Sequence, residues 1–182
     1  MASLQSFLYV AVVAVLVLSP SRATALKRST PMQAAPSPLV ESVCKSNAVG
    51  DYNSCVKALS CPQAAAATNP KALTTVVLKL AREDAKATIG QILNLLKTGP
   101  SPALDQCLKN YQSAVNSFKM VANELREDPM SANYDVKVNT DLADECDRAL
   151  AAARVTAPQL TAANQSLRRF AMIGFEVTSQ LQ

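Results

Sequence analysis

Apolar residues recur at every third or fourth position along four long stretches of this sequence, and a proline opens each stretch. The clearest stretch begins at Ser101-Pro102. Its apolar positions are Leu104, Leu108, Tyr111, Val115, Phe118, Ala122 and Leu125. This spacing predicts an amphipathic helix. Asn69-Pro70 opens the stretch before it, which ends at Gly99-Pro100, and we expect Asn69 to be the N-cap with Pro70 in the first turn.

The other two long stretches complete a set of four helices. One runs from about residue 131 to 154, after Asp128-Pro129, and is the least apolar. The last begins at Pro158 and extends to about residue 181, with apolar positions at Leu160, Ala163, Leu167, Phe170, Gly174, Val177 and Leu181. Four helices joined by short turns must each bury one apolar stripe. The pattern therefore predicts an antiparallel up-down-up-down four-helix bundle over residues 69–182.

Two shorter helical segments precede the bundle. They cover about residues 39–48 and 53–60, and Val49-Gly50-Asp51 forms the break between them. Cys61-Pro62 ends the second segment, because the residue before a proline is driven out of helical geometry. We expect a helical hairpin over residues 39–62 and an all-α protein.

The first 25 residues have the pattern of a secretory signal peptide. Twelve apolar residues, 7–18, are followed by Ala23-Thr24-Ala25, a cleavage-type tripeptide. The apolar run is too short for a membrane anchor, so we expect no membrane association of the mature chain. Residues 26–38 contain three prolines and are predicted to be a flexible lead-in to a domain spanning 39–182. The expected location is extracellular, in the apoplast or cell wall, and a vacuolar destination stays open.

Composition favours a binding protein over an enzyme. The sequence contains no histidine and no tryptophan, and its four glycines are too widely spaced for a phosphate-binding loop. We therefore expect no catalytic residues, no cofactor and no metal site. Removal of Arg22 with the signal peptide lowers the net charge from +4 to +3. The basic residues are scattered along the sequence, so nucleic acid is not an expected partner.

Five cysteines remain in a chain expected to enter an oxidising compartment, which indicates two disulfides and one free thiol. Cys44 and Cys55 lie on opposite arms of the predicted hairpin. Cys107 begins one bundle helix and Cys146 ends the next, so antiparallel packing would bring them level. An alternative pairs Cys61 with Cys44 and leaves Cys55 free.

Four cysteine-containing segments together resemble the plant invertase and pectin methylesterase inhibitors, over about residues 39–181. The segments are Val43-Cys44, Asp51-Tyr52-Asn53-Ser54-Cys55-Val56-Lys57-Ala58-Leu59, Cys107-Leu108-Lys109-Asn110-Tyr111 and Ala143-Asp144-Glu145-Cys146-Asp147. The resemblance implies disulfides Cys44–Cys55 and Cys107–Cys146, with Cys61 as the free thiol. It also implies a secreted inhibitor that occludes the active-site cleft of one enzyme molecule.

Two segments bear on the choice of target. Some invertase inhibitors carry Pro-Lys-Phe between the second and third bundle helices, whereas this chain has Asp128-Pro129-Met130-Ser131. This difference slightly favours pectin methylesterase as the target. Asp144-Glu145-Cys146-Asp147 is more similar to the invertase inhibitors, so acid invertase is the alternative.

Outward polar stripes on the second and third bundle helices are the candidate enzyme-binding face, with Met130 and Tyr134 as anchors. The candidate residues are Lys109, Gln112, Asn116, Lys119, Asn123, Met130, Tyr134, Asp135, Lys137 and Asn139. The alternative is that both stripes are ordinary solvated faces. Asn164-Gln165-Ser166 is a candidate N-glycosylation site. Remoter hypotheses are a secreted helical carrier of small apolar ligands and a structural or signalling wall protein without inhibitory activity.

Overall fold

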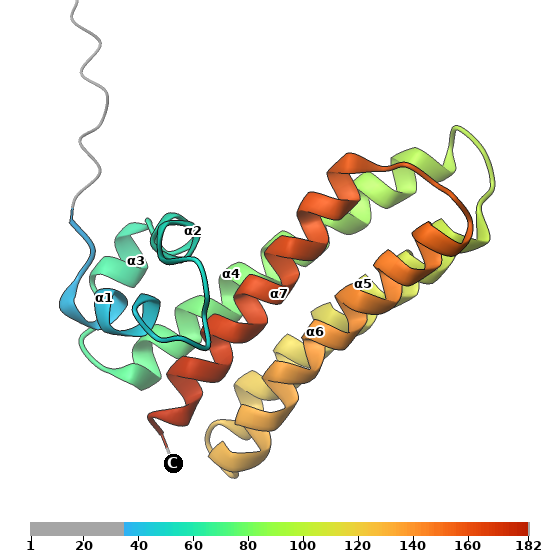
Figure 1. Cartoon of the computed structure of the whole chain (residues 1–182). Coiled ribbons are helices and arrows are strands. Elements are labelled where there is room, and N and C mark those ends of the chain that lie inside the picture. The colour runs from blue at the N-terminus through green and yellow to red at the C-terminus, as the bar shows by residue number, and fades with distance from the viewer. Residues whose placement is uncertain (1–34, 182) are drawn as a thin grey trace, which may run out of the picture. The chain divides into compact units, whose positions relative to one another are not determined.

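Seven helices make up the part of the chain that the computed structural model describes, residues 35–181 (Figure 1). They are α1 (Pro38–Cys44), α2 (Tyr52–Ala58), α3 (Pro62–Ala65), α4 (Pro70–Leu96), α5 (Pro102–Glu124), α6 (Pro129–Ala152) and α7 (Pro158–Ser179). No strand occurs within this range, which confirms the predicted all-α class. The predicted signal peptide and most of the predicted lead-in lie outside the described residues.

The long helices begin where the sequence places their caps. The Asn69 side chain accepts a hydrogen bond from the Ala72 amide at 2.9 Å, and the Ser101 hydroxyl accepts one from the Leu104 amide at 3.4 Å. Each cap is followed directly by proline, which has no amide hydrogen to leave unsatisfied in the first turn. The caps therefore fix the starts of α4 and α5 to the predicted residue.

The short N-terminal helices differ in detail from the prediction. α1 ends at Cys44, earlier than expected, and residues 45–49 form turns. Gly50, at φ +79°, takes the left-handed conformation that reverses the chain, and Asp51 caps α2 through the Ser54 amide at 3.0 Å. One extra helical turn, α3, begins at Pro62, between the predicted hairpin and the predicted bundle, where no helix was predicted. It forms because Pro62 suits a first helical position and alanine has high helix propensity.

The four long helices form a bundle in which α4 and α6 each pack against both α5 and α7 (Figure 1). Asn110 bonds to the carbonyl of Leu142, and Asn139 bonds to Ser117, so residue numbers fall along α6 as they rise along α5. These two helices are therefore antiparallel. The same reversal relates α6 to α7, where Asn133 meets Thr178 and Asp144 meets Arg168.

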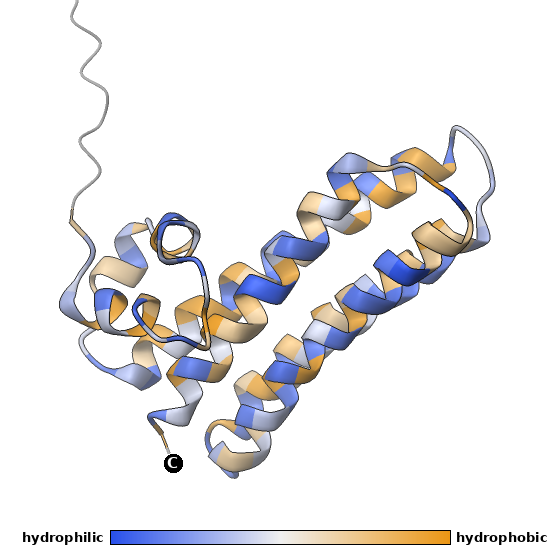
Figure 2. Ribbon diagram, viewed as in Figure 1, coloured by the Kyte–Doolittle hydropathy of each residue, from blue (hydrophilic) through white to orange (hydrophobic). Residues whose placement is uncertain are grey.

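Most residues of the predicted apolar stripes face the centre of the bundle, but Ala122 of the predicted α5 stripe is exposed. Figure 2 shows hydrophobic and hydrophilic segments alternating along each long helix. The largest side chains that are fully buried include Tyr111 and Phe118 from α5, Leu73 and Ile92 from α4, and Leu160 from α7. At Gly174, α7 approaches α6 so closely that an added Cβ would lie 2.5 Å from Val136 Cγ2. Among the described helices, none is both long and apolar enough to cross a membrane.

Two disulfides brace the structure, as predicted. Cys44–Cys55 closes the α1–α2 hairpin with a Cα–Cα distance of 5.5 Å, and Cys107–Cys146 joins α5 to α6 at 4.6 Å. Cys61 forms neither bridge and is a free thiol, so the alternative pairing of Cys61 with Cys44 is wrong. Ser46 donates a hydrogen bond of 2.6 Å to Glu176 and thereby links the hairpin to α7.

Candidate enzyme-binding face

The corner between α5 and α6 is held by a compact cap. Asp128 accepts hydrogen bonds from the Ser131 amide at 3.1 Å and from the Ser131 hydroxyl at 2.6 Å. These bonds lower the pKa of the Asp128 carboxyl, because they favour its charged form. Pro129 occupies the first helical position. Residues 128–131 are therefore the rigid start of α6, and Met130 projects from it.

Exposed apolar side chains gather beside this corner. Met130 is 71% exposed, Tyr134 69% and Val138 37%, and they stand four residues apart on α6. Met120 of α5 is 47% exposed. Residues four apart lie on one side of a helix, so the α6 residues form a row. The hydrogen bond between Asn139 and Ser117 sets the register of the two helices and places Met120 level with Tyr134 on the same outer side.

We call these four residues, Met120, Met130, Tyr134 and Val138, the apolar face. Apolar side chains scattered singly on a surface are ordinary, but a cluster of methionines and an aromatic residue is typical of interaction sites. Tyrosine is also enriched among the residues that contribute most binding energy at interfaces. The two anchors that the sequence predicted, Met130 and Tyr134, are thus fully available for contact.

The five predicted α5 residues all reach solvent, but they are not aligned with the apolar face. Lys109, Gln112, Asn116, Lys119 and Asn123 are exposed. With a turn of about 100° per residue, Gln112, Lys119 and Asn123 lean toward α4 instead of α6. Lys109 and Asn116 lie between the side of α5 toward α4 and the side toward α6. The predicted ten-residue surface is therefore divided between two sides of the bundle.

Asn139 is not a surface residue, which corrects the prediction. It is fully buried, and its Nδ2 atom donates to Ser117 Oγ at 2.9 Å and to the carbonyls of Val136 and Asp135. A helix position on the boundary between core and solvent is difficult to assign from periodicity when the helix is weakly apolar. The neighbouring Asn133 is buried too and binds Thr178 and the carbonyl of Phe175. Both asparagines join helices instead of facing a partner.

Asp135 and Lys137, the remaining predicted residues, have neighbours within the bundle. Lys137 is exposed, but its ammonium lies 4.9 Å from the centre of the Phe175 ring of α7, on the side away from α5. Asp135 is partly buried beside Glu124. Burial raises the pKa of Glu124, and the carboxylates of Asp135 and Asp128 raise it further. One Glu124 oxygen, Oε2, is buried without a hydrogen-bond partner, although the side chain as a whole is only partly covered.

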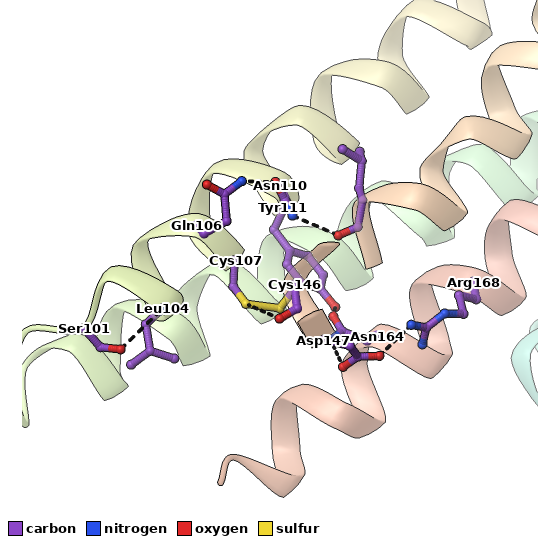
Figure 3. Close-up of a disulfide and its surroundings, with 11 residues drawn as sticks. Ser101, Leu104, Gln106, Cys107, Asn110, Tyr111, Cys146, Asp147, Asn164 and Arg168 are labelled. Atoms are coloured by element: carbon purple, nitrogen blue, oxygen red, sulfur yellow. Dashed lines mark hydrogen bonds and ion pairs between the residues drawn. A yellow bond between two sulfur atoms is a disulfide. The ribbon is translucent and has the colours of Figure 1, made fainter. Parts of the chain in front are cut away.

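Asn164 has no room for a glycan in the folded chain, so the glycosylation prediction is wrong. The side chain is fully buried, accepts a hydrogen bond of 2.8 Å from the Tyr111 hydroxyl and donates one of 2.5 Å to Asp147 (Figure 3). Asp147 also pairs with Arg168, which pairs with Asp144 in turn. The acidic residues around Cys146 are therefore engaged in holding α6 to α7.

Within residues 35–181, no group of three or more cysteine, aspartate or glutamate side chains is arranged to hold a metal ion. Burial raises the pKa of the Tyr111 hydroxyl above its ordinary value, and the hydroxyl is hydrogen-bonded inside the bundle. The fold and its surface thus define a disulfide-braced helical bundle with an exposed apolar face.

Comparison with known proteins identifies the family to which this helical bundle belongs. The family model for plant invertase/pectin methylesterase inhibitors matches residues 38–178, so the chain belongs to that family. Among solved structures, a mutant form of a pectin methylesterase inhibitor from Arabidopsis is similar with a TM-score of 0.69. It shares 20% sequence identity, over 79% of this chain and 97% of that chain.

A second solved structure, a pectin methylesterase inhibitor from Arabidopsis thaliana, has a TM-score of 0.58. Its sequence is also 20% identical, over 79% of this chain and 96% of its own. At this identity the likeness is one of fold. No curated protein sequence matches the chain.

Proposed function

We propose that this protein is a secreted inhibitor of a plant cell-wall carbohydrate enzyme, with pectin methylesterase as the favoured target. Membership of the inhibitor family over residues 38–178 carries the proposal. In this proposal the mature chain begins after Ala25, acts in the apoplast and catalyses nothing itself. It binds one enzyme molecule and covers the active-site cleft.

The apolar face is the surface that we assign to this contact. Met130 and Tyr134 are its most exposed members, and the capped corner at Asp128 holds them on rigid backbone. Anchors that are already ordered lose less conformational entropy on binding. Lys109 and Asn116, at its edge, supply charge and hydrogen bonds for the rim of the contact. The remaining α5 residues lie on a different side and are not needed for it.

Acid invertase is the second candidate target, because Asp144-Glu145-Cys146-Asp147 is similar to the corresponding segment of invertase inhibitors. In the structure, however, Asp144 and Asp147 pair with Arg168 inside the molecule. The similarity of this segment to the invertase inhibitors therefore reflects shared packing between helices more than a shared target enzyme. Met130, in place of the Lys-Phe of some invertase inhibitors, points toward pectin methylesterase.

A paired titration tests the proposal. Refolded, oxidised chain starting at Leu26 is added to pectin methylesterase and to acid invertase, at mildly acidic and near-neutral pH. We expect saturable loss of pectin methylesterase activity near one-to-one stoichiometry. Full activity of both enzymes in the presence of folded protein would end the inhibitor proposal and make binding of small apolar ligands the next assay. Loss of invertase activity alone would transfer the proposal to the second target.

A truncation in the apolar face locates the contact. Tyr134→Ala should weaken inhibition at least tenfold, because truncation of an interface anchor costs about 2 kcal/mol. The matched control is Leu93→Ala, which removes another exposed apolar side chain (45% exposed) from α4. Equal inhibition constants for the two variants would place the contact elsewhere on the bundle. Circular dichroism of both variants verifies that neither substitution disturbs the fold.

A further inference from the structure

Basic residues that are scattered along the sequence lie on one side of α4 in the folded chain. On α4, Lys71, Lys79, Arg82, Lys86 and Lys97 are separated by intervals of 8, 3, 4 and 11 residues. At about 3.6 residues per turn, these intervals return to nearly the same side of the helix. At about 1.5 Å per residue, the row extends roughly 40 Å. α4 therefore carries cations along one outer side for its whole length.

Two lysines of α5 extend this row sideways. α4 and α5 pack antiparallel, with Thr88 of α4 beside the Tyr111 hydroxyl of α5. This register places Lys119 level with Lys79, and Lys109 lies further along α5. We call these residues the basic face: Lys71, Lys79, Arg82, Lys86, Lys97, Lys109 and Lys119. Only two carboxylates, Glu83 and Asp105, lie at its margins. The whole chain has 18 basic and 14 acidic residues, so outside these seven cations the acidic residues are in excess, 14 against 11.

No cation of the basic face forms an ion pair within the described residues, although the Lys97 ammonium donates a hydrogen bond of 3.0 Å to Asn94 Oδ1. Within the part of the chain that the structure describes, the only ion pairs are Lys45–Glu41 and those of Arg168. All members except Arg82 are exposed. Arg82 is partly covered, and its Nε atom is buried without a hydrogen-bond partner. Seven cations thus lie on α4, its C-cap and α5, and none of them has a carboxylate partner among residues 35–181.

The uncharged residues between the cations indicate what kind of polyanion fits. They are the polar Thr75, Gln112, Asn116 and Asn123, together with one apolar side chain, Leu93. Amides and hydroxyls both donate and accept hydrogen bonds, which suits the many hydroxyl groups of a sugar polymer. No aromatic side chain belongs to this face, whereas proteins that bind single-stranded nucleic acid generally stack bases on aromatic rings. The composition therefore favours an acidic polysaccharide over nucleic acid.

We propose that the basic face of α4 and α5 binds a linear polyuronide, a polysaccharide with a carboxylate on each sugar ring. The choice of this polymer rests on the proposed function. Hydrolysis of pectin methyl esters leaves such carboxylates behind, so the polymer would be most abundant where the target enzyme has acted. Release of counterions from the polymer supplies the binding free energy, which makes the affinity salt-dependent. The four residues of the apolar face do not belong to this surface, and Lys109 and Asn116 lie at the border between the two faces.

The experiment measures binding of polygalacturonate to the oxidised mature chain by calorimetry, without enzyme and at low ionic strength. The test variant is Lys79→Glu with Lys86→Glu, on exposed positions of α4. The matched control is Lys57→Glu with Arg148→Glu, which changes the net charge equally at exposed positions of α2 and α6. We expect the affinity to fall at least about tenfold in the test variant and less than about threefold in the control, with a shallower salt dependence in the test variant.

Fully methyl-esterified pectin and a single-stranded oligonucleotide are the comparison polymers. The esterified polymer has the same backbone without charge and should bind at least tenfold more weakly. Equal loss of affinity in the two charge variants, equal binding of esterified pectin, or tighter binding of the oligonucleotide would each overturn the proposal. The enzyme titration is separate. Polymer binding without inhibition would refute only the proposed function, and inhibition without polymer binding would refute only this inference.

Discussion

α6 is attached to its two neighbours by different means, although both attachments involve polar residues. On the α5 side, the Cys107–Cys146 disulfide is flanked by hydrogen bonds from Asn139 to Ser117 and from Asn110 to the Leu142 carbonyl. On the α7 side there is no covalent bond. The contact depends on close packing at Gly174 and on the network of Tyr111, Asn164, Asp147 and Arg168 (Figure 3). Asp144 also belongs to this network, because it pairs with Arg168.

The difference follows from how little apolar surface α6 offers. A weakly apolar helix gains less from burial, so other interactions must hold it. The disulfide acts mainly on the unfolded chain, by restricting its conformations. The polar network acts only in the folded chain, and its two buried members, Tyr111 and Asn164, each require a hydrogen-bond partner. The two sides should therefore respond differently to substitution.

The largest effect is expected on the covalent side. Cys107→Ala with Cys146→Ala opens a loop whose ends are 39 residues apart. The chain-entropy model gives a loss of about 4 kcal/mol in the free energy of unfolding. Urea unfolding followed by circular dichroism measures it, in a Cys61→Ser background that prevents thiol exchange.

The hairpin disulfide provides the comparison for that measurement. Cys44→Ala with Cys55→Ala opens a loop with a separation of 11 residues, for which the same model gives about 3 kcal/mol. A loss under about 1 kcal/mol for the Cys107 and Cys146 pair would mean that hydrogen bonds alone hold α5 to α6.

A smaller effect is expected on the α7 side from Asn164→Ala. The substitution leaves the buried Tyr111 hydroxyl without its acceptor, which costs about 2 kcal/mol. The same unfolding experiment measures it, with Asn116→Ala on the exposed side of α5 as the control. If the two variants unfold at the same urea concentration, the network does not stabilise the α6–α7 contact.

The sequence predicts the features of this fold that depend on local order. Asn69 and Ser101 before proline, and the periodicity of α5, identify helix starts and buried sides because each signal lies within a few neighbouring residues. The same helix arrangement makes the Cys107–Cys146 disulfide possible, whereas the family resemblance implied the full pairing. Once α5 and α6 are antiparallel, the start of one helix meets the end of the other, and Cys107 is level with Cys146.

The polar contacts between helices could not be predicted in this way. Asn139 and Asn164 are polar in the sequence and were expected at the surface, yet each is fully buried by a partner on another helix. Their burial depends on Ser117 and Tyr111, more than twenty residues away. The basic face could not be predicted either, because its residues come from α4 and α5 and lie together only when these two helices pack side by side.

The smallest effect on stability is expected at the α5–α6 corner, where Glu124 faces Asp135 and Asp128. Burial and these carboxylates raise the pKa of Glu124 in the folded chain above its unfolded value. The folded state then holds a proton that the unfolded state releases, so stability falls as pH rises between the two values.

Glu124→Gln removes that loss. Its melting temperature should exceed that of the unsubstituted chain by about 1 °C at pH 7, and the difference should vanish near pH 4. Glu127→Gln, at an exposed position in the same turn, is the matched control. A lower melting temperature for Glu124→Gln at pH 7 would mean that the charged carboxylate stabilises this corner, as the disulfide and hydrogen bonds do further along α6.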